Sequence, residues 1–294
     1  MAHRHSTTSS LRRLLITMIL NFVITIADVI GGILSGSLSL LSDALHNFSD
    51  GIAVIISYIA IRLNERPKNQ HYTFGMKRAE ILAAVINASS LIIICFFLFK
   101  TAYSRLISPN PIAGGLMVGV AGAGFLANVI GTLLLRKNAR ENMNIRASYL
   151  HLLSDAISSI AVITGGLFIY FFQIYWIDPV LTILISLYVL KESFSIIKTA
   201  VNMIMMGSPE NISLADIKNE IESFPGIQNI HHVHVWRLNE REIHFEAHIE
   251  VEDMKVSETS QLLRQIENRL VEKFQISHVT LQFECGVCDS KTLI

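Results

Sequence analysis

Charged residues are scarce in this chain of 294 residues, at 16% of the sequence, whereas about a quarter is usual in soluble domains. They are also unevenly spread, because residues 1–206 hold 16 Lys and Arg with 9 Asp and Glu, while residues 207–294 hold 8 and 15. The net charge of zero is therefore a mildly basic first part cancelling an acidic last part, a pattern that gives no sign of nucleic-acid binding. The composition indicates a multi-span membrane domain followed by a small soluble domain.

Other absences narrow the function further. Three cysteines, Cys95, Cys285 and Cys288, cannot form the disulfide framework of a secreted domain. The polar start of the chain has neither the apolar core nor the cleavage site of a signal peptide, so we expect the first apolar helix to remain as an anchor. No HExxH motif is present and no spare general base accompanies the metal-ligand candidates below, so we do not expect a membrane metalloprotease or another enzyme.

What the chain does have is long apolar segments. A helix needs about 20 mostly apolar residues to cross a bilayer. Six segments within residues 14–206 meet this condition, and residues 1–13 before them are expected to form a cytoplasmic tail. The six segments are Leu14–Leu34, Leu38–Ile61, Ala79–Phe99, Ile112–Leu135, Ala147–Phe172 and a segment from Ile177 into the low 190s. The sequence therefore predicts a six-helix membrane domain.

Basic residues set the expected orientation of these helices. They gather before the first segment, between the second and third, and between the fourth and fifth, while the opposite connections hold little beyond Arg105. By the positive-inside rule, both termini are expected in the cytoplasm.

After residue 206 the pattern changes to that of a soluble domain. "ISLADIKNEIESF" and "SETSQLLRQIENRLVEKF" have helical spacing, whereas "IHHVHVWRL", "EIHFEAHIEVE" and "SHVTLQFE" alternate like strands. Residues 207–294 therefore predict a cytoplasmic α+β domain of order αββαβ, like that of metallochaperones.

Two histidine–aspartate pairs interrupt the apolar segments. His46 and Asp50 lie four residues apart, as do His151 and Asp155, and both stretches follow the pattern HxxSDxIxxI. Residues four apart share one helix face, so two facing helices would offer two imidazoles and two carboxylates, a tetrahedral set that suits Zn2+. Such pairs can also hold helices together by hydrogen bonds alone, but two pairs with identical spacing favour a metal site. Asp43, one turn before His46, is expected to orient that histidine rather than to bind metal.

With these pairs, "YTFGMKRAEILAAVINA" and "HHVHVW", the chain resembles the cation diffusion facilitator family of metal/proton antiporters over nearly its whole length. The resemblance implies a homodimer that exports Zn2+ from the cytoplasm in exchange for protons, with the ligands His46, Asp50, His151 and Asp155. Members with aspartate in place of His46 are less selective in this family. A bacterial inner membrane is the expected location, and an organelle membrane remains an alternative.

The resemblance also implies regulatory Zn2+ in the cytoplasmic domain, with His232, His248 and Glu284 at matching positions; solvated polar strand faces are the alternative. The CxxC formed by Cys285 and Cys288 has zinc-site spacing but supplies only two ligands. Similarity to vesicular zinc transporters suggests His3 and His5 as the other two, although both could be incidental residues of the tail. Two further functions stay open, namely a broader exporter of Cd2+ or Co2+ and a membrane metal sensor that moves no ions.

Overall fold

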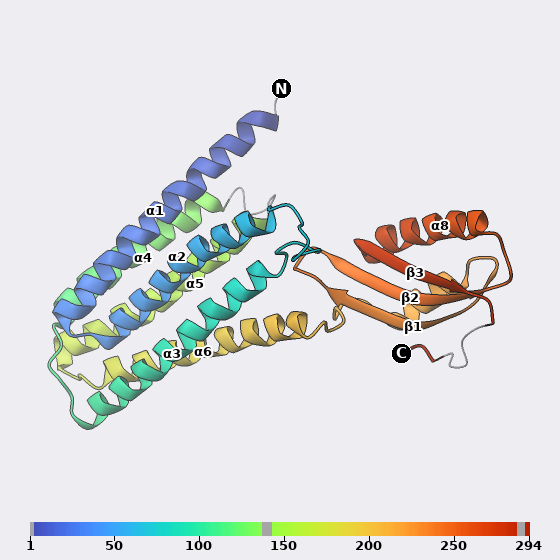
Figure 1. The fold of residues 1–294 in the computed structure, drawn as a ribbon. Helices are drawn as coiled ribbons and strands as arrows, with labels where there is room; N and C mark the ends of the chain where they lie inside the picture. Colours follow the sequence, from blue (N-terminus) through green and yellow to red (C-terminus); the bar gives the residue numbers. More distant parts are fainter. Residues whose placement is uncertain (1–2, 137–142, 287–291) are drawn as a thin grey trace. The chain divides into compact units, whose positions relative to one another are not determined.

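The computed structural model describes residues 3–136, 143–286 and 292–294. The chain divides into two compact units, one formed by Met1–Ile56 with Ile86–Ile197 and the other by Ser57–Val85 with Lys198–Ile294. The first six helices along the chain, labelled in Figure 1, are α1 (His3–Ser35), α2 (Leu38–Asn64), α3 (Ala79–Ile107), α4 (Gly114–Leu135), α5 (Met143–Phe172) and α6 (Ile177–Ile204). They correspond to the six apolar segments of the sequence.

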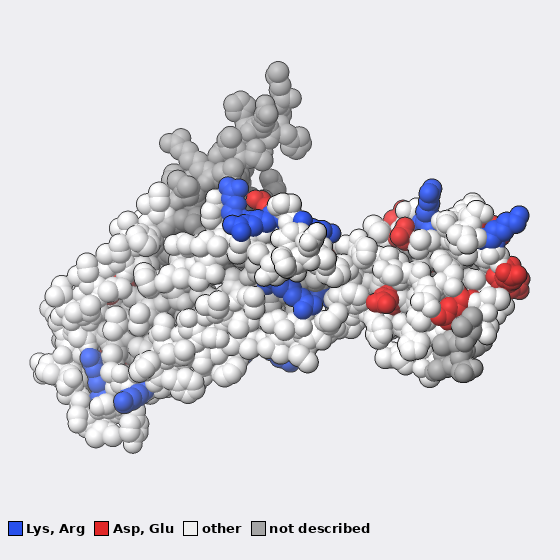
Figure 2. All heavy atoms as spheres, viewed as in Figure 1, with Lys and Arg blue, Asp and Glu red and all other residues white. Residues whose placement is uncertain are grey.

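Five of these helices, α2 to α6, are long and apolar enough to cross a membrane, and the described side chains of α1 add a shorter apolar stretch, Ile19–Ser35. Many of their large apolar side chains point outward, including Phe97 at 67% exposure and Phe171 at 69%. The flanks of the helices are almost free of charged side chains in the view of Figure 2. Such surfaces are stable only against lipid, which confirms the predicted membrane domain.

Helices α4 and α5 approach each other closely because glycines lie where they meet. A Cβ atom on Gly114 would lie 2.7 Å from the backbone nitrogen of Tyr170 and 2.9 Å from the carbonyl oxygen of Gly166, and one on Gly166 would lie 2.8 Å from Val118 Cγ2. Helix–helix contacts in membranes commonly use small residues for this purpose. The glycines therefore fix α5, which carries His151 and Asp155, closely against α4.

The C-terminal part of the chain forms α7 (Leu214–Glu222), β1 (Ile227–Arg237), β2 (Ile243–Val251), α8 (Val256–Phe274) and β3 (His278–Glu284). The sheet has the order β1-β2-β3, with β1 and β2 antiparallel and β2 and β3 parallel. The predicted αββαβ order is confirmed.

One apolar core joins the sheet of this domain to both helices. Phe245 and Ile249 of β2 pack in the same cluster as Ile221 of α7 and Ile266 and Leu270 of α8, and each is at most 1% exposed. The helix α8 is amphipathic, so one face enters this core and its polar face remains outside.

Strand β1 contains a bulge. His231 pairs with His248, but the next aligned pair is His234 with Glu246, so two residues of β1 oppose one residue of β2. His232 lies in the bulge with φ of 50°, in the left-handed region that few non-glycine residues adopt. A bulge of this kind interrupts the alternation of side chains along a strand.

Candidate metal centres

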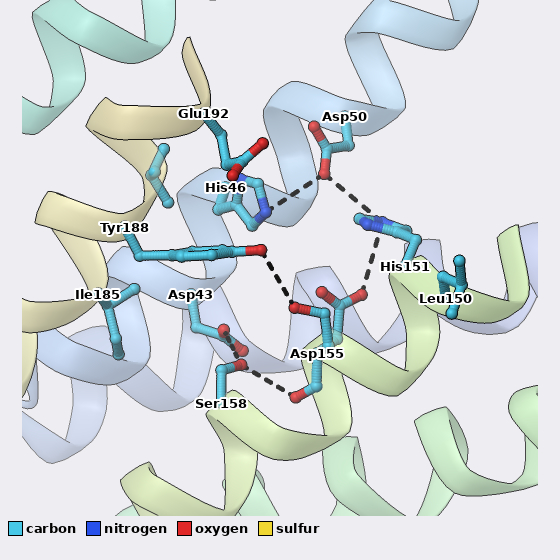
Figure 3. Close-up of a pocket in the computed structure, with 12 residues that line it drawn as sticks. Asp43, His46, Asp50, Leu150, His151, Asp155, Ser158, Ile185, Tyr188 and Glu192 are labelled. Carbon is cyan, nitrogen blue, oxygen red and sulfur yellow. Dashed lines mark hydrogen bonds and ion pairs between the residues drawn. The ribbon is translucent and has the colours of Figure 1, made fainter. Parts of the chain in front are cut away.

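The two histidine–aspartate pairs meet between α2 and α5. Asp50 Oδ2 lies 3.5 Å from His46 Nε2 and 3.5 Å from His151 Nε2, and the same nitrogen of His151 lies 3.5 Å from Asp155 Oδ2. The imidazole rings are 6.3 Å apart between centroids. Figure 3 shows the four side chains converging on one space, with Asp50 between the two histidines.

This space is a pocket of about 350 Å³. It is lined by Asp43, His46, Asp50, Leu150, His151, Ser154, Asp155, Ser158, Ile185, Tyr188, Val189 and Glu192. The His151 side chain is 38% exposed and that of Asp155 only 6%, so the pocket is open near the beginning of α5 and becomes enclosed one turn further along that helix.

Several of the converging atoms lack hydrogen-bond partners. His46 Nδ1, Asp50 Oδ2 and Asp155 Oδ2 are buried and make no hydrogen bond within the described part of the chain. Leaving such groups unpaired in a membrane interior is costly. A divalent cation would use the nitrogen and oxygen lone pairs together, and two imidazoles with two carboxylates are a donor set that Zn2+ accepts.

Asp43 also lines the pocket, and its hydrogen-bond partner is on α5. Ser158 Oγ lies 2.9 Å from Asp43 Oδ1 and also 2.9 Å from the carbonyl oxygen of Asp155. Asp43 therefore connects α2 to the turn of α5 that follows Asp155, and the expected direct role in orienting His46 stays a prediction.

Sequence reasoning missed the polar residues that α6 contributes to the pocket, Tyr188 and Glu192. The Tyr188 hydroxyl lies 3.4 Å from Ser154 Oγ, which joins α6 to α5. Ile185, Tyr188 and Glu192 are three and four residues apart, so they share one helix face. The spacing of four residues between Tyr188 and Glu192 was the available signal.

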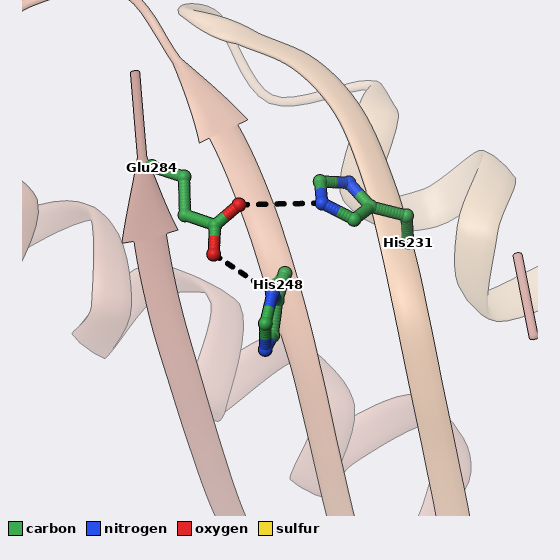
Figure 4. Close-up of side chains that lie close together, drawn as sticks. All are labelled: His231, His248 and Glu284. Carbon is green, nitrogen blue, oxygen red and sulfur yellow. Dashed lines mark ion pairs between the residues drawn. The ribbon is translucent and has the colours of Figure 1, made fainter. Parts of the chain in front are cut away.

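The second cluster lies on the sheet of the C-terminal domain and contains His231, His248 and Glu284. One ligand atom from each residue lies within 4.8 Å of the other two. His248 Nδ1 is 2.8 Å from Glu284 Oε1, and His231 Nε2 is 3.3 Å from Glu284 Oε2. Figure 4 shows both rings pointing at the carboxylate.

These ligand atoms are available for a cation. His231 Nε2, His248 Nδ1 and Glu284 Oε2 are buried without a well-directed hydrogen bond in the described residues. His231 Nδ1 lies 3.1 Å from Asn229 Oδ1, and a partner of this kind fixes the ring with its other nitrogen toward a metal. The cluster supplies three donors, which leaves room for a fourth from water or another residue.

The structure brings together two of the three residues expected here, and it puts His231 where His232 was expected. His232 is exposed, with its ring 5.1 Å from that of His248, and it does not belong to the three-residue cluster. The reason is the bulge in β1, which strict alternation along "IHHVHVW" could not reveal. Another histidine of β2, His244, stacks on Trp236, and burial lowers the pKa of His244.

The site expected from the CxxC stays a prediction. The side chains of His3 and His5 and the whole of Cys288 lie outside the described residues, and Cys285 is an exposed free cysteine.

Comparison with known proteins covers both domains. Residues 14–205 match the cation efflux transmembrane domain, and residues 209–285 match the cytoplasmic domain of cation efflux proteins. The zinc transporter ZitB of Pectobacterium atrosepticum is 38% identical over 98% of this chain and 91% of its own length. A cadmium, cobalt and zinc/H(+)-K(+) antiporter of Bacillus subtilis is 37% identical over 97% of this chain and 92% of its own. The metal cation efflux system protein CzcD of Cupriavidus metallidurans is 34% identical over 95% and 88%. The chain therefore belongs to the cation efflux, or cation diffusion facilitator, family of metal transporters.

Proposed function

We propose that this protein exports Zn2+ from the cytoplasm in exchange for protons, through a tetrahedral site made of His46, Asp50, His151 and Asp155. The observation that carries the proposal is the convergence of these four side chains within 3.5 Å contacts while buried ligand atoms remain without hydrogen bonds. Relatives named as zinc transporters and as a metal/H(+)-K(+) antiporter support the choice of ions.

The same residues account for exchange with protons. A histidine has a reference pKa of about 6.5 and must be neutral to bind a metal ion. Zinc entering the pocket therefore displaces protons from the imidazoles and carboxylates, and protons arriving from the opposite side of the membrane displace zinc. In this scheme one set of ligands binds both ions in turn, with no separate coupling element.

The proposed arrangement in the cell follows from the basic connections and from the relatives. Both termini lie in the cytoplasm, and the protein resides in the inner membrane of a bacterium, since the named relatives are bacterial. It functions as a homodimer, which the match of residues 209–285 to the family's dimer-forming cytoplasmic domain supports.

The decisive test is zinc uptake into inside-out vesicles under an imposed pH gradient, with wild type beside Asp155→Ala. We expect uptake that depends on the gradient and is lost in the variant. The control is Asp216→Ala, which removes an exposed carboxylate of α7 and should retain uptake. Uptake that ignores the gradient would refute proton exchange, and full uptake by Asp155→Ala would refute the assigned site. Zinc binding without uptake by the wild type would identify a sensor.

A broader range of ions is the second candidate, favoured by the relative named for cadmium, cobalt and zinc. Nitrogen and oxygen ligands accept all three metals. The test is zinc uptake into the same vesicles with Cd2+ or Co2+ present at equal concentration. Neither ion should inhibit uptake by a selective zinc exporter, whereas both should inhibit uptake by a broad exporter.

We further propose that His231, His248 and Glu284 hold a regulatory Zn2+. Replacement of Glu284 by glutamine removes the carboxylate between the two rings and should weaken zinc binding at this site by about tenfold or more. The measurement is zinc titration of the purified full chain carrying Asp155→Ala, which removes a ligand of the membrane site. Glu252→Gln makes the same change at an exposed position just after β2 and is the control; equal affinity in both variants would contradict the proposal.

A further inference from the structure

The first turn of α2 is held by a residue of another helix. Asp178, at the beginning of α6, accepts hydrogen bonds from Ser37 Oγ at 2.6 Å, Leu38 N at 2.7 Å, Ser39 N at 3.0 Å and Ser39 Oγ at 2.6 Å. Asp178 is fully buried, and Ser37 and Ser39 are at most 1% exposed. We call Asp178, Ser37, Leu38 and Ser39 the clasp.

The clasp satisfies groups that neither helix could satisfy alone. The first backbone N–H groups of a helix have no partner within it, and a carboxylate there gains both hydrogen bonds and a favourable interaction with the helix dipole. The Asp178 carboxylate in turn accepts all four of these hydrogen bonds. Because hydrogen bonds to an ionised group are the stronger kind, the clasp ties the beginnings of α2 and α6 together.

The clasp lies on one side of the transport site. Leu38 lies eight positions before His46, about 12 Å along α2, and Asp178 lies ten positions before Tyr188, about 15 Å along α6. We call the end of the membrane domain that contains the clasp the distal end. It is the end where α1 finishes, opposite the beginning of α5.

The exposure of the candidate ligands and of Asp43 decreases toward the distal end. On α2 the side chain of Asp50 is 27% exposed and that of His46 is 22%, while Asp43 is 7% exposed. On α5 the value falls from 38% at His151 to 6% at Asp155. The site is therefore open toward the beginning of α5 and closed toward the clasp.

We infer that the clasp is the distal gate of the transport site and that Asp178 is its positioning residue. An ion that enters beside His151 can leave at the distal end only after α2 and α6 separate there, which breaks the four hydrogen bonds to Asp178. The clasp thus favours the conformation that receives the ion. This inference rests on the proposed transport function.

Thiol labelling tests the gate without any transport. In a chain with Cys95, Cys285 and Cys288 replaced by serine, Leu40→Cys places a thiol at a 1% exposed position next to the clasp. A membrane-impermeant maleimide is applied to the distal face. We expect Asp178→Asn, which loses the charge but keeps the shape, to label about tenfold faster than the parent. Ser186→Ala, a buried change about two turns further along α6, should label at the parent rate.

Transport kinetics separate a gate from a merely structural contact. If the distal-open conformation gains population, fewer molecules can receive zinc, so the zinc concentration for half-maximal uptake should rise in Asp178→Asn. A contact needed only for folding would lower the maximal rate and leave half-saturation unchanged. Ser37→Ala and Ser39→Ala each remove one hydroxyl donor and should shift labelling and half-saturation in the same direction by less.

Unchanged labelling in Asp178→Asn, or equally faster labelling from both faces of the membrane, would overturn the inference. The labelling rate can be interpreted even if the ligand assignment fails. It reports the conformation of α2 whether or not Asp155→Ala retains uptake. Faster distal labelling together with intact uptake in Asp155→Ala would keep the gate and reject the ligand assignment.

Discussion

Asp50→Asn is expected to reduce zinc uptake by at least about a hundredfold. Asp50 is the one carboxylate of the site whose Oδ2 lies 3.5 Å from both histidine nitrogens, on α2 and on α5. The amide keeps the size of the side chain but removes the negative charge that balances the cation. Loss of a group that only supports a metal ligand typically costs 10-fold to 100-fold, so loss of a ligand should cost more.

The measurement is the initial rate of zinc uptake into vesicles at matched protein content. Asp253→Asn is the matched control, because it makes the same chemical change at an exposed position of the C-terminal domain. A loss of less than about threefold would show that Asp50 is not a ligand. If a higher zinc concentration restores the uptake rate of Asp50→Asn, Asp50 contributes to zinc binding rather than to movement of the ion.

Phe245→Ala is expected to have the largest effect on stability. Phe245 lies in the middle strand of the sheet, is 1% exposed and belongs to the core shared with α7 and α8. Removing a buried phenylalanine side chain costs about 3–5 kcal/mol. A domain of this size has a total stability of about 4–13 kcal/mol, so the substitution takes a large share of it.

Hydrogen exchange of the full chain in detergent, followed over β1, β2 and β3, measures this effect. The sheet should lose protection in Phe245→Ala, while α4 and α5 keep theirs. Val271→Ala on α8, where the side chain is 51% exposed, should change protection little. Retained protection in Phe245→Ala would mean that the sheet does not depend on this core.

Features set by local spacing were predictable from the sequence. The histidine and aspartate of each pair share a helix face because they lie four residues apart, and the repetition of the pattern in α2 and α5 suggested that the pairs meet. The alternating segments of the last domain likewise indicated the order αββαβ. Both follow from the periodicity of a single helix or strand.

Features that depend on irregular backbone or on distant partners were not predictable. Because of the bulge in β1, the cluster with His248 and Glu284 contains His231 and not the expected His232. No residue in "IHHVHVW" marks where the alternation breaks. Asp178 has donors about 140 residues away along the chain, so its sequence neighbours give no sign of the contact. Only the tertiary structure brings these groups together.

The glycines between α4 and α5 limit how the membrane domain can move. A side chain at position 114 would clash with the backbone of α5, because its Cβ would lie less than 3 Å from atoms of Tyr170 and Gly166. Because α4 and α5 pack this closely, we expect them to move together in any transition that exposes His151 and Asp155 to the opposite side of the membrane. Asp155 then moves with these two helices and Asp50 with α2, so we expect the distance between the two aspartates to change during the transition.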